Sequence, residues 1–135
     1  MKIMIGIWGN YASQFLSAVG WLIMLIFAIP ITVWPFKWAK LVGWEVPQQT
    51  HLALYFGRCL GCVAIAVALF SIFAAKNNLV QPFYFKFLIF IWTSMVILHI
   101  YGAIKKIQPK LETYEIGFWS GLVLITLFFW PNVPA

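Results

Sequence analysis

Residues 51–75 read HLALYFGRCLGCVAIAVALFSIFAA, a run in which Arg58 is the only Lys, Arg, Asp or Glu. The 24 residues between His51 and Lys76 make about 36 Å of α-helix, which is enough to cross a bilayer core of about 30 Å. The stretch therefore predicts a membrane-spanning helix that contains an arginine.

The polar residues of this run share one helix face. His51, Tyr55, Arg58 and Cys62 are separated by four, three and four residues, and these separations nearly complete whole helical turns. Arg58 lies about 10 Å along the helix from His51. An ionised side chain at that depth is costly and normally faces the protein interior with a partner. We therefore expect a counter-ion for Arg58.

The composition excludes a water-soluble domain. The 135 residues are 64% hydrophobic and 9% charged, whereas a soluble domain has about 25% charged residues. The net charge is +6, but its cations flank apolar runs and do not form one basic face. Anionic lipid headgroups explain such cations better than nucleic acid, and we expect no nucleic-acid partner.

The apolar runs predict one all-α domain over residues 1–135, an antiparallel bundle of four transmembrane helices. The fourth run, Ile116 to Trp130, is only about 22 Å long as a helix and must gain residues at one end. Pro131 discourages extension forward, so we expect a start near Leu111 that carries Glu115 to the membrane boundary. The predicted spans are residues 13–34, 52–75, 83–104 and 111–130.

The connector between the first two spans is rich in tryptophan and lysine, which together mark the headgroup level. Pro35 is well placed to begin a short interfacial helix that ends near Gly43. A membrane anchor is one interpretation of this connector, and a lateral gate or ligand lid is the other. The tryptophans and lysines concerned are Trp34, Trp38, Trp44, Lys37 and Lys40.

Lysine counts predict the orientation. The first and third connectors hold five lysines and the opposite side holds three, which puts both termini on the non-cytoplasmic side. The five are Lys37, Lys40, Lys105, Lys106 and Lys110, and the three are Lys2, Lys76 and Lys86.

This topology predicts that Arg58, His99 and Glu115 approach one membrane face at similar depth. Glu115 is the expected counter-ion of Arg58, and His99 could bridge them. One interpretation is a structural ion pair that holds span two to span four. The other is a cytoplasmic-side cavity for an anionic or quinone-like ligand, with Tyr55 and Trp119 as its walls.

Glycine spacing predicts where helices touch. Gly57-x-x-x-Gly61 and Gly117-x-x-x-Gly121 both match the small-residue pattern of close helix contacts. We therefore expect spans two and four to present these glycines to neighbouring helices.

Cys59 and Cys62 form a C-x-x-C motif inside an apolar helix. A reactive thiolate needs an electropositive, partly exposed setting, and the chain has no second cysteine pair, so we interpret both as small hydrophobic side chains. Together with His51 or His99 they form no tetrahedral set of ordinary spacing, so we expect no metal site. We also find no catalytic motif, and therefore predict no catalytic residue.

The layout from Phe27 to Leu69 resembles the DoxX-like group of small four-span bacterial membrane proteins. The resemblance lies in the connector Lys37–Pro47 and the glycine-containing second span at Gly57–Gly61. It implies a four-helix protein of the bacterial inner membrane, and some members of the group are associated with quinone-linked sulfur oxidation. The C-x-x-C motif and the high tryptophan content depart from the group's pattern.

Three functions follow as hypotheses. The first is a non-catalytic subunit or small-ligand or lipid-binding bundle, with the bilayer and other membrane subunits or further copies of itself as partners. The second is a quinone-linked redox component, for which quinone would be the one cofactor. The third is a small transporter or channel formed by oligomerisation.

Overall fold

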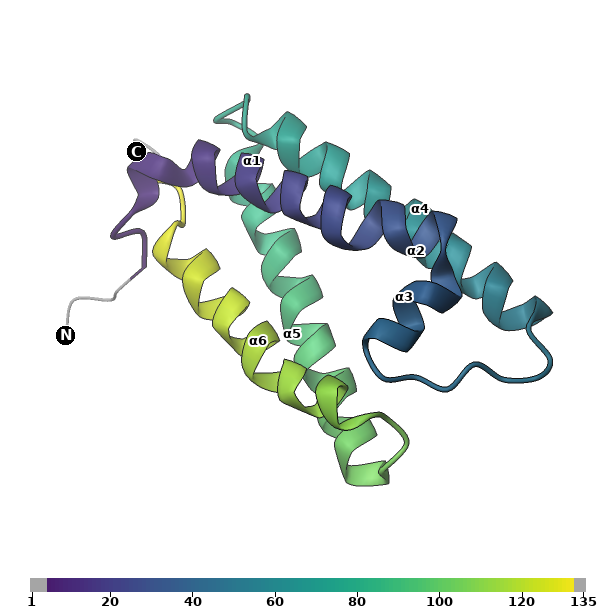
Figure 1. The fold of residues 1–135 in the computed structure, drawn as a ribbon. Helices are drawn as coiled ribbons and strands as arrows, with labels where there is room; N and C mark the ends of the chain where they lie inside the picture. Colours follow the sequence, from purple (N-terminus) through teal and green to yellow (C-terminus); the bar gives the residue numbers. More distant parts are fainter. Residues whose placement is uncertain (1–4, 133–135) are drawn as a thin grey trace.

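The computed structural model describes residues 5–132, and Lys2, which the charge count above includes, lies outside them. Every regular element in this range is helical (Figure 1). The elements are a short 3₁₀ turn η1 (Gly9–Tyr11), α1 (Ala12–Leu22), a π-helical segment η2 (Ile23–Ala28), α2 (Ile29–Val33), α3 (Pro35–Leu41), α4 (His51–Ala74), α5 (Gln81–Lys105) and α6 (Lys110–Phe128).

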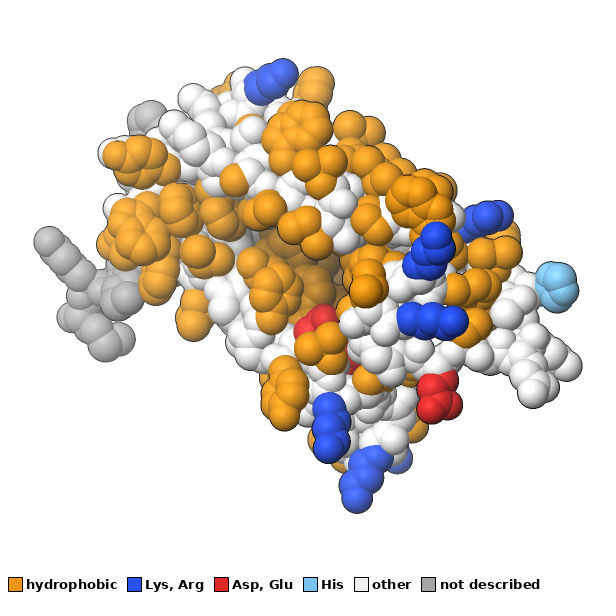
Figure 2. All heavy atoms as spheres, in the orientation of Figure 1, with side chains coloured by type: hydrophobic (Ala, Val, Ile, Leu, Met, Phe, Trp, Pro, Cys, Tyr) orange, Lys and Arg blue, Asp and Glu red, His pale blue; other side chains and the backbone are white. Residues whose placement is uncertain are grey.

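Four helical stretches are long and apolar enough to cross a membrane, which confirms the predicted number of spans. The first joins η1, α1, η2 and α2 into one run, and the others are α4, α5 and α6. Large hydrophobic side chains are exposed on all four, and Figure 2 shows them spread over the visible face. Such a surface suits lipid and not water. The chain is therefore an integral membrane protein.

The first two spans form an antiparallel pair in which small residues let the backbones approach. A Cβ at Gly20 would lie 2.8 Å from the Ala68 carbonyl oxygen of α4. The buried Ser71 hydroxyl donates to the Leu16 carbonyl oxygen at 2.8 Å. Contacts of this kind replace the hydrophobic effect, which does not drive helices together in lipid.

The last two spans, α5 and α6, form the second antiparallel pair. The Trp92 indole N–H of α5 donates to the Thr126 hydroxyl of α6 at 3.2 Å, and both side chains are buried. The turn after α5 is tight because Lys106 adopts a left-handed backbone with φ of 56°.

The two pairs share a core near the chain termini and separate toward the opposite end (Figure 1). In an antiparallel bundle of the predicted kind, spans two and three are neighbours because a short turn joins them. They are bonded close to their common turn, where the Tyr84 hydroxyl donates to the Val67 carbonyl oxygen. Beyond that point α4 follows the first span and α5 follows α6. The core residues are Ala12, Phe15, Leu16, Val19, Ala74, Tyr84, Phe85, Leu88 and Trp92.

The connector at the diverging end carries the short helix α3 back toward the first span. Pro30 has no N–H and leaves the Ile26 carbonyl without its usual helical donor. The Trp38 indole N–H of α3 donates to that oxygen at 3.3 Å. The π-helical segment η2 ends two residues before Pro30. The proline therefore interrupts the series of helical hydrogen bonds and leaves free the carbonyl oxygen to which Trp38 of α3 binds.

Candidate functional site

His99 is the most deeply buried ionisable side chain at the diverging end of the molecule. It lies on α5, nearly two helical turns before the last residue of that helix, Lys105, and is only 3% exposed. Its Nδ1 lies 2.7 Å from the Met95 carbonyl oxygen. A carbonyl oxygen only accepts hydrogen bonds, so Nδ1 must carry a hydrogen and donate it.

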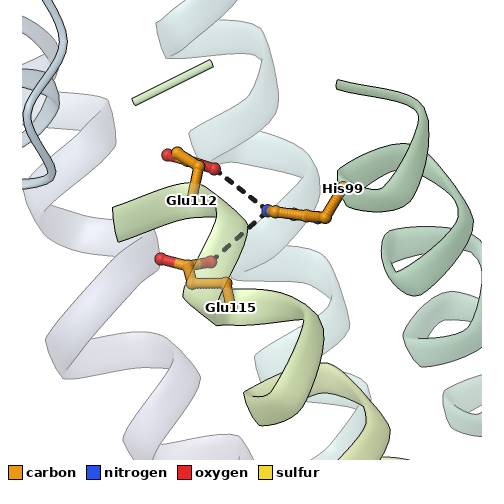
Figure 3. Close-up of side chains that lie close together, drawn as sticks. All are labelled: His99, Glu112 and Glu115. Atoms are coloured by element: carbon orange, nitrogen blue, oxygen red, sulfur yellow. Dashed lines mark hydrogen bonds and ion pairs between the residues drawn. The ribbon is translucent and has the colours of Figure 1, made fainter. Parts of the chain in front are cut away.

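Two glutamates of α6 face the other ring nitrogen of His99 (Figure 3). Nε2 lies 3.0 Å from Glu112 Oε2 and 3.5 Å from Glu115 Oε2. The glutamates are three residues apart in the first turns of the helix, so they share one face. One donor atom from each of the three residues lies within 4.8 Å of the others.

The ends of the two helices hold this cluster in place. Pro109 precedes the first residue of α6 and sets its start. The Gln108 side chain turns back from the connector and donates to the His99 carbonyl oxygen at 3.0 Å and to the Thr113 hydroxyl at 3.2 Å. The connector between α5 and α6 is thus bonded to both helices that carry the site.

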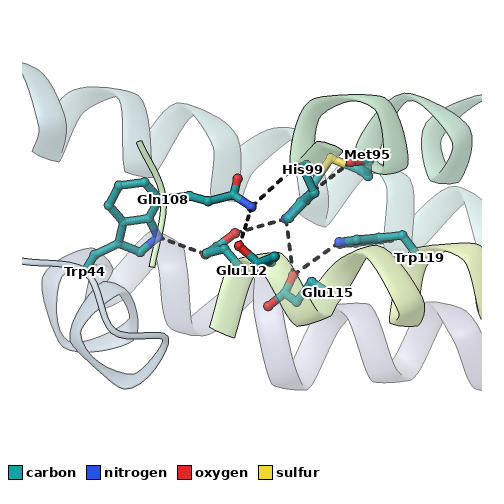
Figure 4. Close-up of polar contacts among 8 residues, drawn as sticks. Trp44, Met95, His99, Gln108, Glu112, Glu115 and Trp119 are labelled. Atoms are coloured by element: carbon teal, nitrogen blue, oxygen red, sulfur yellow. Dashed lines mark hydrogen bonds and ion pairs between the residues drawn. The ribbon is translucent and has the colours of Figure 1, made fainter. Parts of the chain in front are cut away.

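Two indoles orient the carboxylates (Figure 4). The Trp44 N–H donates to Glu112 Oε1 at 2.8 Å, and the Trp119 N–H donates to Glu115 Oε2 at 3.2 Å. Trp119 belongs to α6 itself, whereas Trp44 comes from the connector that follows α3. The site therefore draws on both helix pairs.

The cluster has an excess of negative charge that one positive species must offset. With Nδ1 donating, a neutral His99 presents only a lone pair at Nε2, directed at two carboxylates. Lone pairs facing each other at hydrogen-bond distance repel, so a proton or a cation has to lie among the three groups. The side chains of Glu112 and Glu115 are 15% and 26% exposed, which leaves a route to the surface.

The structure brings part of the predicted polar cluster together. His99 and Glu115 lie at ion-pair distance. The ring of Trp119 lies beside that of His99, with centroids 6.0 Å apart. Three predicted site residues from α5 and α6 therefore meet as the topology argument expected.

The prediction that Arg58 and Tyr55 join this cluster is wrong. Both side chains are exposed on α4, and within residues 5–132 the ion pairs involve His99 with its two glutamates and not Arg58. The reason is the rotation of α4. Gly61 faces Thr32 of the first span and Gly57 faces Pro35 of α3, and Arg58 lies about 100° round the helix from Gly57.

Of the two glycine pairs predicted to contact a helix, one does so in the structure and the other does not. A Cβ at Gly57 would lie 2.9 Å from Pro35, and one at Gly61 would clash with Thr32, so both are helix contact sites. A Cβ at Gly117 or Gly121 would meet no atom within 4 Å. The prediction that the glycines of span four contact a helix is therefore wrong, because that face of α6 is open.

Sequence reasoning missed three members of the site. Glu112 lay inside the predicted fourth span but was given no role, although its three-residue spacing from Glu115 indicates a shared helix face. Trp44 was interpreted as part of an anchor or lid, and Gln108 carried no signal of its own. The metal sets considered from the sequence all include the cysteines. In the structure the two cysteines lie on α4, away from His99, with Cys62 exposed and Cys59 partly exposed.

Comparison with known proteins gives no relative for this chain. No family model, no curated protein and no solved structure matches it.

Proposed function

We propose that this protein is a small, non-catalytic membrane protein that binds a cation at the His99–Glu112–Glu115 cluster. The observation that supports it is the direction of His99 Nε2, which points at two carboxylates while Nδ1 donates to a backbone carbonyl. The anionic ligand considered from the sequence needed Arg58 in the site. Without that arginine the charge of the site favours a positive ligand.

The proposed setting is the bacterial inner membrane. The four helices act there as one antiparallel bundle, with α3 at the headgroup level and both termini on the non-cytoplasmic side. The shared core near the termini supports the bundle. The lysines and tryptophans on and beside α3 support its interfacial position, and the lysine count supports the orientation. The DoxX-like layout agrees with this arrangement and stays a prediction.

Thermal unfolding of the purified protein in detergent tests the proposal. After dialysis against a chelator, sodium, calcium, magnesium, zinc and an organic ammonium salt are added separately while helicity is followed by circular dichroism. A bound cation raises the Tm because it binds the folded state alone. We expect at least one of them to do so in the wild type and to fail in Glu112→Gln/Glu115→Gln.

The control is Glu45→Gln, which removes an exposed carboxylate on the connector and should keep the full Tm increase. The double variant keeps the volume of both side chains, and its circular dichroism spectrum shows whether it is folded. If every cation raises the Tm of the wild type and of the double variant equally, the cluster is not the binding site and the proposal is wrong.

A second candidate function, quinone-linked redox chemistry, is favoured by a different feature. An apolar cavity of about 280 Å³ lies between α3, the connector and the start of α4. Small-ligand sites are mostly apolar pockets of about this size or larger, about 300–1,000 Å³. Extraction of the purified protein and analysis for quinone tests this candidate. Gly57 lines the cavity, and a leucine there would press against Pro35 and change its shape. If folded Gly57→Leu retains as much quinone as the wild type, the cavity is not a quinone site.

Transport by an oligomer is the third hypothesis from the sequence and stays a prediction. Ion flux into liposomes that contain the purified protein would test it directly.

A further inference from the structure

The donor atoms of the cluster are those that a transition metal prefers. They are one imidazole nitrogen and two carboxylate oxygens, contributed by two different helices. Zn²⁺ and similar ions bind this mixed set, whereas Ca²⁺ takes six to eight oxygen ligands and Mg²⁺ is bound by oxygen atoms and water. The imidazole in the set therefore favours a metal of the zinc class.

The spacing of these atoms is close to that of a tetrahedral site. Bonds of about 2.0–2.1 Å to zinc place two ligand atoms about 3.4 Å apart in a tetrahedron. Nε2 lies 3.0 Å from Glu112 Oε2 and 3.5 Å from Glu115 Oε2. These two separations match two edges of the tetrahedron. The three donor atoms lie within 4.8 Å of one another, so rotation of the glutamate side chains toward each other would complete the third edge.

The groups behind the donor atoms also match a metal site. A histidine that binds a metal usually donates its other ring N–H to a carbonyl or carboxylate, as His99 does to the Met95 carbonyl oxygen. Both carboxylates receive an indole N–H, from Trp44 and Trp119. These bonds hold all three ligands in one orientation before an ion arrives.

The net charge of the site also favours a divalent metal ion. A neutral imidazole, two carboxylates and one divalent cation sum to zero, which is the arrangement that costs least near the apolar part of a membrane. A single proton on the cluster leaves one negative charge behind. Three protein ligands also leave a fourth tetrahedral position, on the side where the two glutamates are partly exposed.

We infer that His99 Nε2, Glu112 Oε2 and Glu115 Oε2 bind one divalent transition metal ion of the zinc class. This inference rests on the proposed cation-binding function and names the cation.

Cobalt binding tests the inference. Co²⁺ is added alone to chelator-treated protein in detergent, because tetrahedral Co²⁺ has intense visible absorption bands and octahedral Co²⁺ has weak ones. We expect these bands to saturate at one Co²⁺ per chain and to disappear when Zn²⁺ displaces it. His99→Gln and Glu115→Gln should abolish the bands, and Trp119→Phe should weaken binding by about 10- to 100-fold.

The matched controls are His51→Gln and Glu45→Gln. Both residues are exposed and lie outside the cluster, so both variants should keep the bands. Equal Co²⁺ binding by the wild type and by His99→Gln would identify a surface site and overturn the inference. X-ray absorption of zinc-loaded wild type needs no variant, and should show nitrogen and oxygen ligands that include imidazole. Sulfur ligands would point to the cysteines and would also overturn it.

The two proposals fail in different ways. If neither Co²⁺ nor Zn²⁺ binds but another cation raises the Tm through the two glutamates, the metal inference is wrong and the cation-binding function stands. If no cation raises the Tm at all, both are wrong.

Discussion

Gly61 lies where α4 comes closest to the first span, and replacing it by alanine tests the helix pairing directly. A Cβ at this position would lie 2.8 Å from the backbone nitrogen of Thr32 and 2.9 Å from its Cα, whereas ordinary contact begins at 3.4 Å. The atoms that it meets include backbone, which cannot rotate away as a side chain can. The two helices must therefore separate by about 0.6 Å to accept one methyl group.

Gly121 provides the matched control. It is also a glycine inside a spanning helix, but a Cβ there would meet no atom within 4 Å. Both substitutions gain about 0.5–1 kcal/mol because alanine loses less conformational freedom in a helix than glycine. Only Gly61→Ala also costs about 1–3 kcal/mol for overpacking. The difference between the two variants isolates that overpacking cost, because the helix gain cancels.

Unfolding in mixed micelles measures this difference. Each variant is titrated with a denaturing detergent while helicity is followed by circular dichroism. We expect Gly121→Ala to be as stable as the wild type or more stable. The free energy of unfolding of Gly61→Ala should be about 1–3 kcal/mol lower than that of Gly121→Ala. Equal stability of the two variants would show that α4 does not pack against the first span through Gly61.

The same unfolding experiment checks three further predictions. Ser71→Ala should cost about 0.5–1.5 kcal/mol, because it removes a buried hydrogen bond between α4 and α1, and an unchanged free energy would contradict that bond. Thr126→Val should cost about 1–3 kcal/mol, because it leaves the buried Trp92 N–H without its acceptor, and wild-type stability would mean that the indole has another partner. Arg58→Leu should leave stability unchanged or raise it, because the arginine is exposed and the ion pairs within residues 5–132 do not include it. If Arg58→Leu lost as much stability as Glu115→Leu, the result would instead support the Arg58–Glu115 ion pair predicted from the sequence.

The spanning helices could be predicted because their signal is local. A run of apolar residues and the thickness of a bilayer fix each span without knowledge of its neighbours. The structure puts the spans at Gly9–Val33, His51–Ala74, Gln81–Lys105 and Lys110–Phe128, within a few residues of the predicted limits.

The position of Arg58 could not be predicted because it depends on how α4 is rotated. The cost of a charge in lipid indicates that a partner is needed, but not which helix supplies it. The close contacts of Gly61 with the first span and of Gly57 with Pro35 of α3 decide the rotation. The sequence contains two glycine pairs of the same spacing, and either pair could have formed such contacts. Only the packing of distant segments distinguishes them, and one sequence does not contain that information.

Glu112 was missed for a different reason, because the expected helix already contained it but only Glu115 was considered as a partner for Arg58. A start near Leu111 was expected, and α6 begins at Lys110. This start puts Glu112 in the first turn on the same face as Glu115. A sequence in which two glutamates are three residues apart at a helix start could have been interpreted as a paired site.

Glu112 also connects the cluster to the rest of the molecule. Its Oε2 faces His99 of α5, while its Oε1 accepts the indole N–H of Trp44 from the connector of the other helix pair. Close by, a Cβ at Gly43 would lie 3.3 Å from Pro109, so the first and third connectors touch here. At the end where the helix pairs diverge, the Glu112 carboxylate thus contacts His99 in the site and also joins the two helix pairs through Trp44.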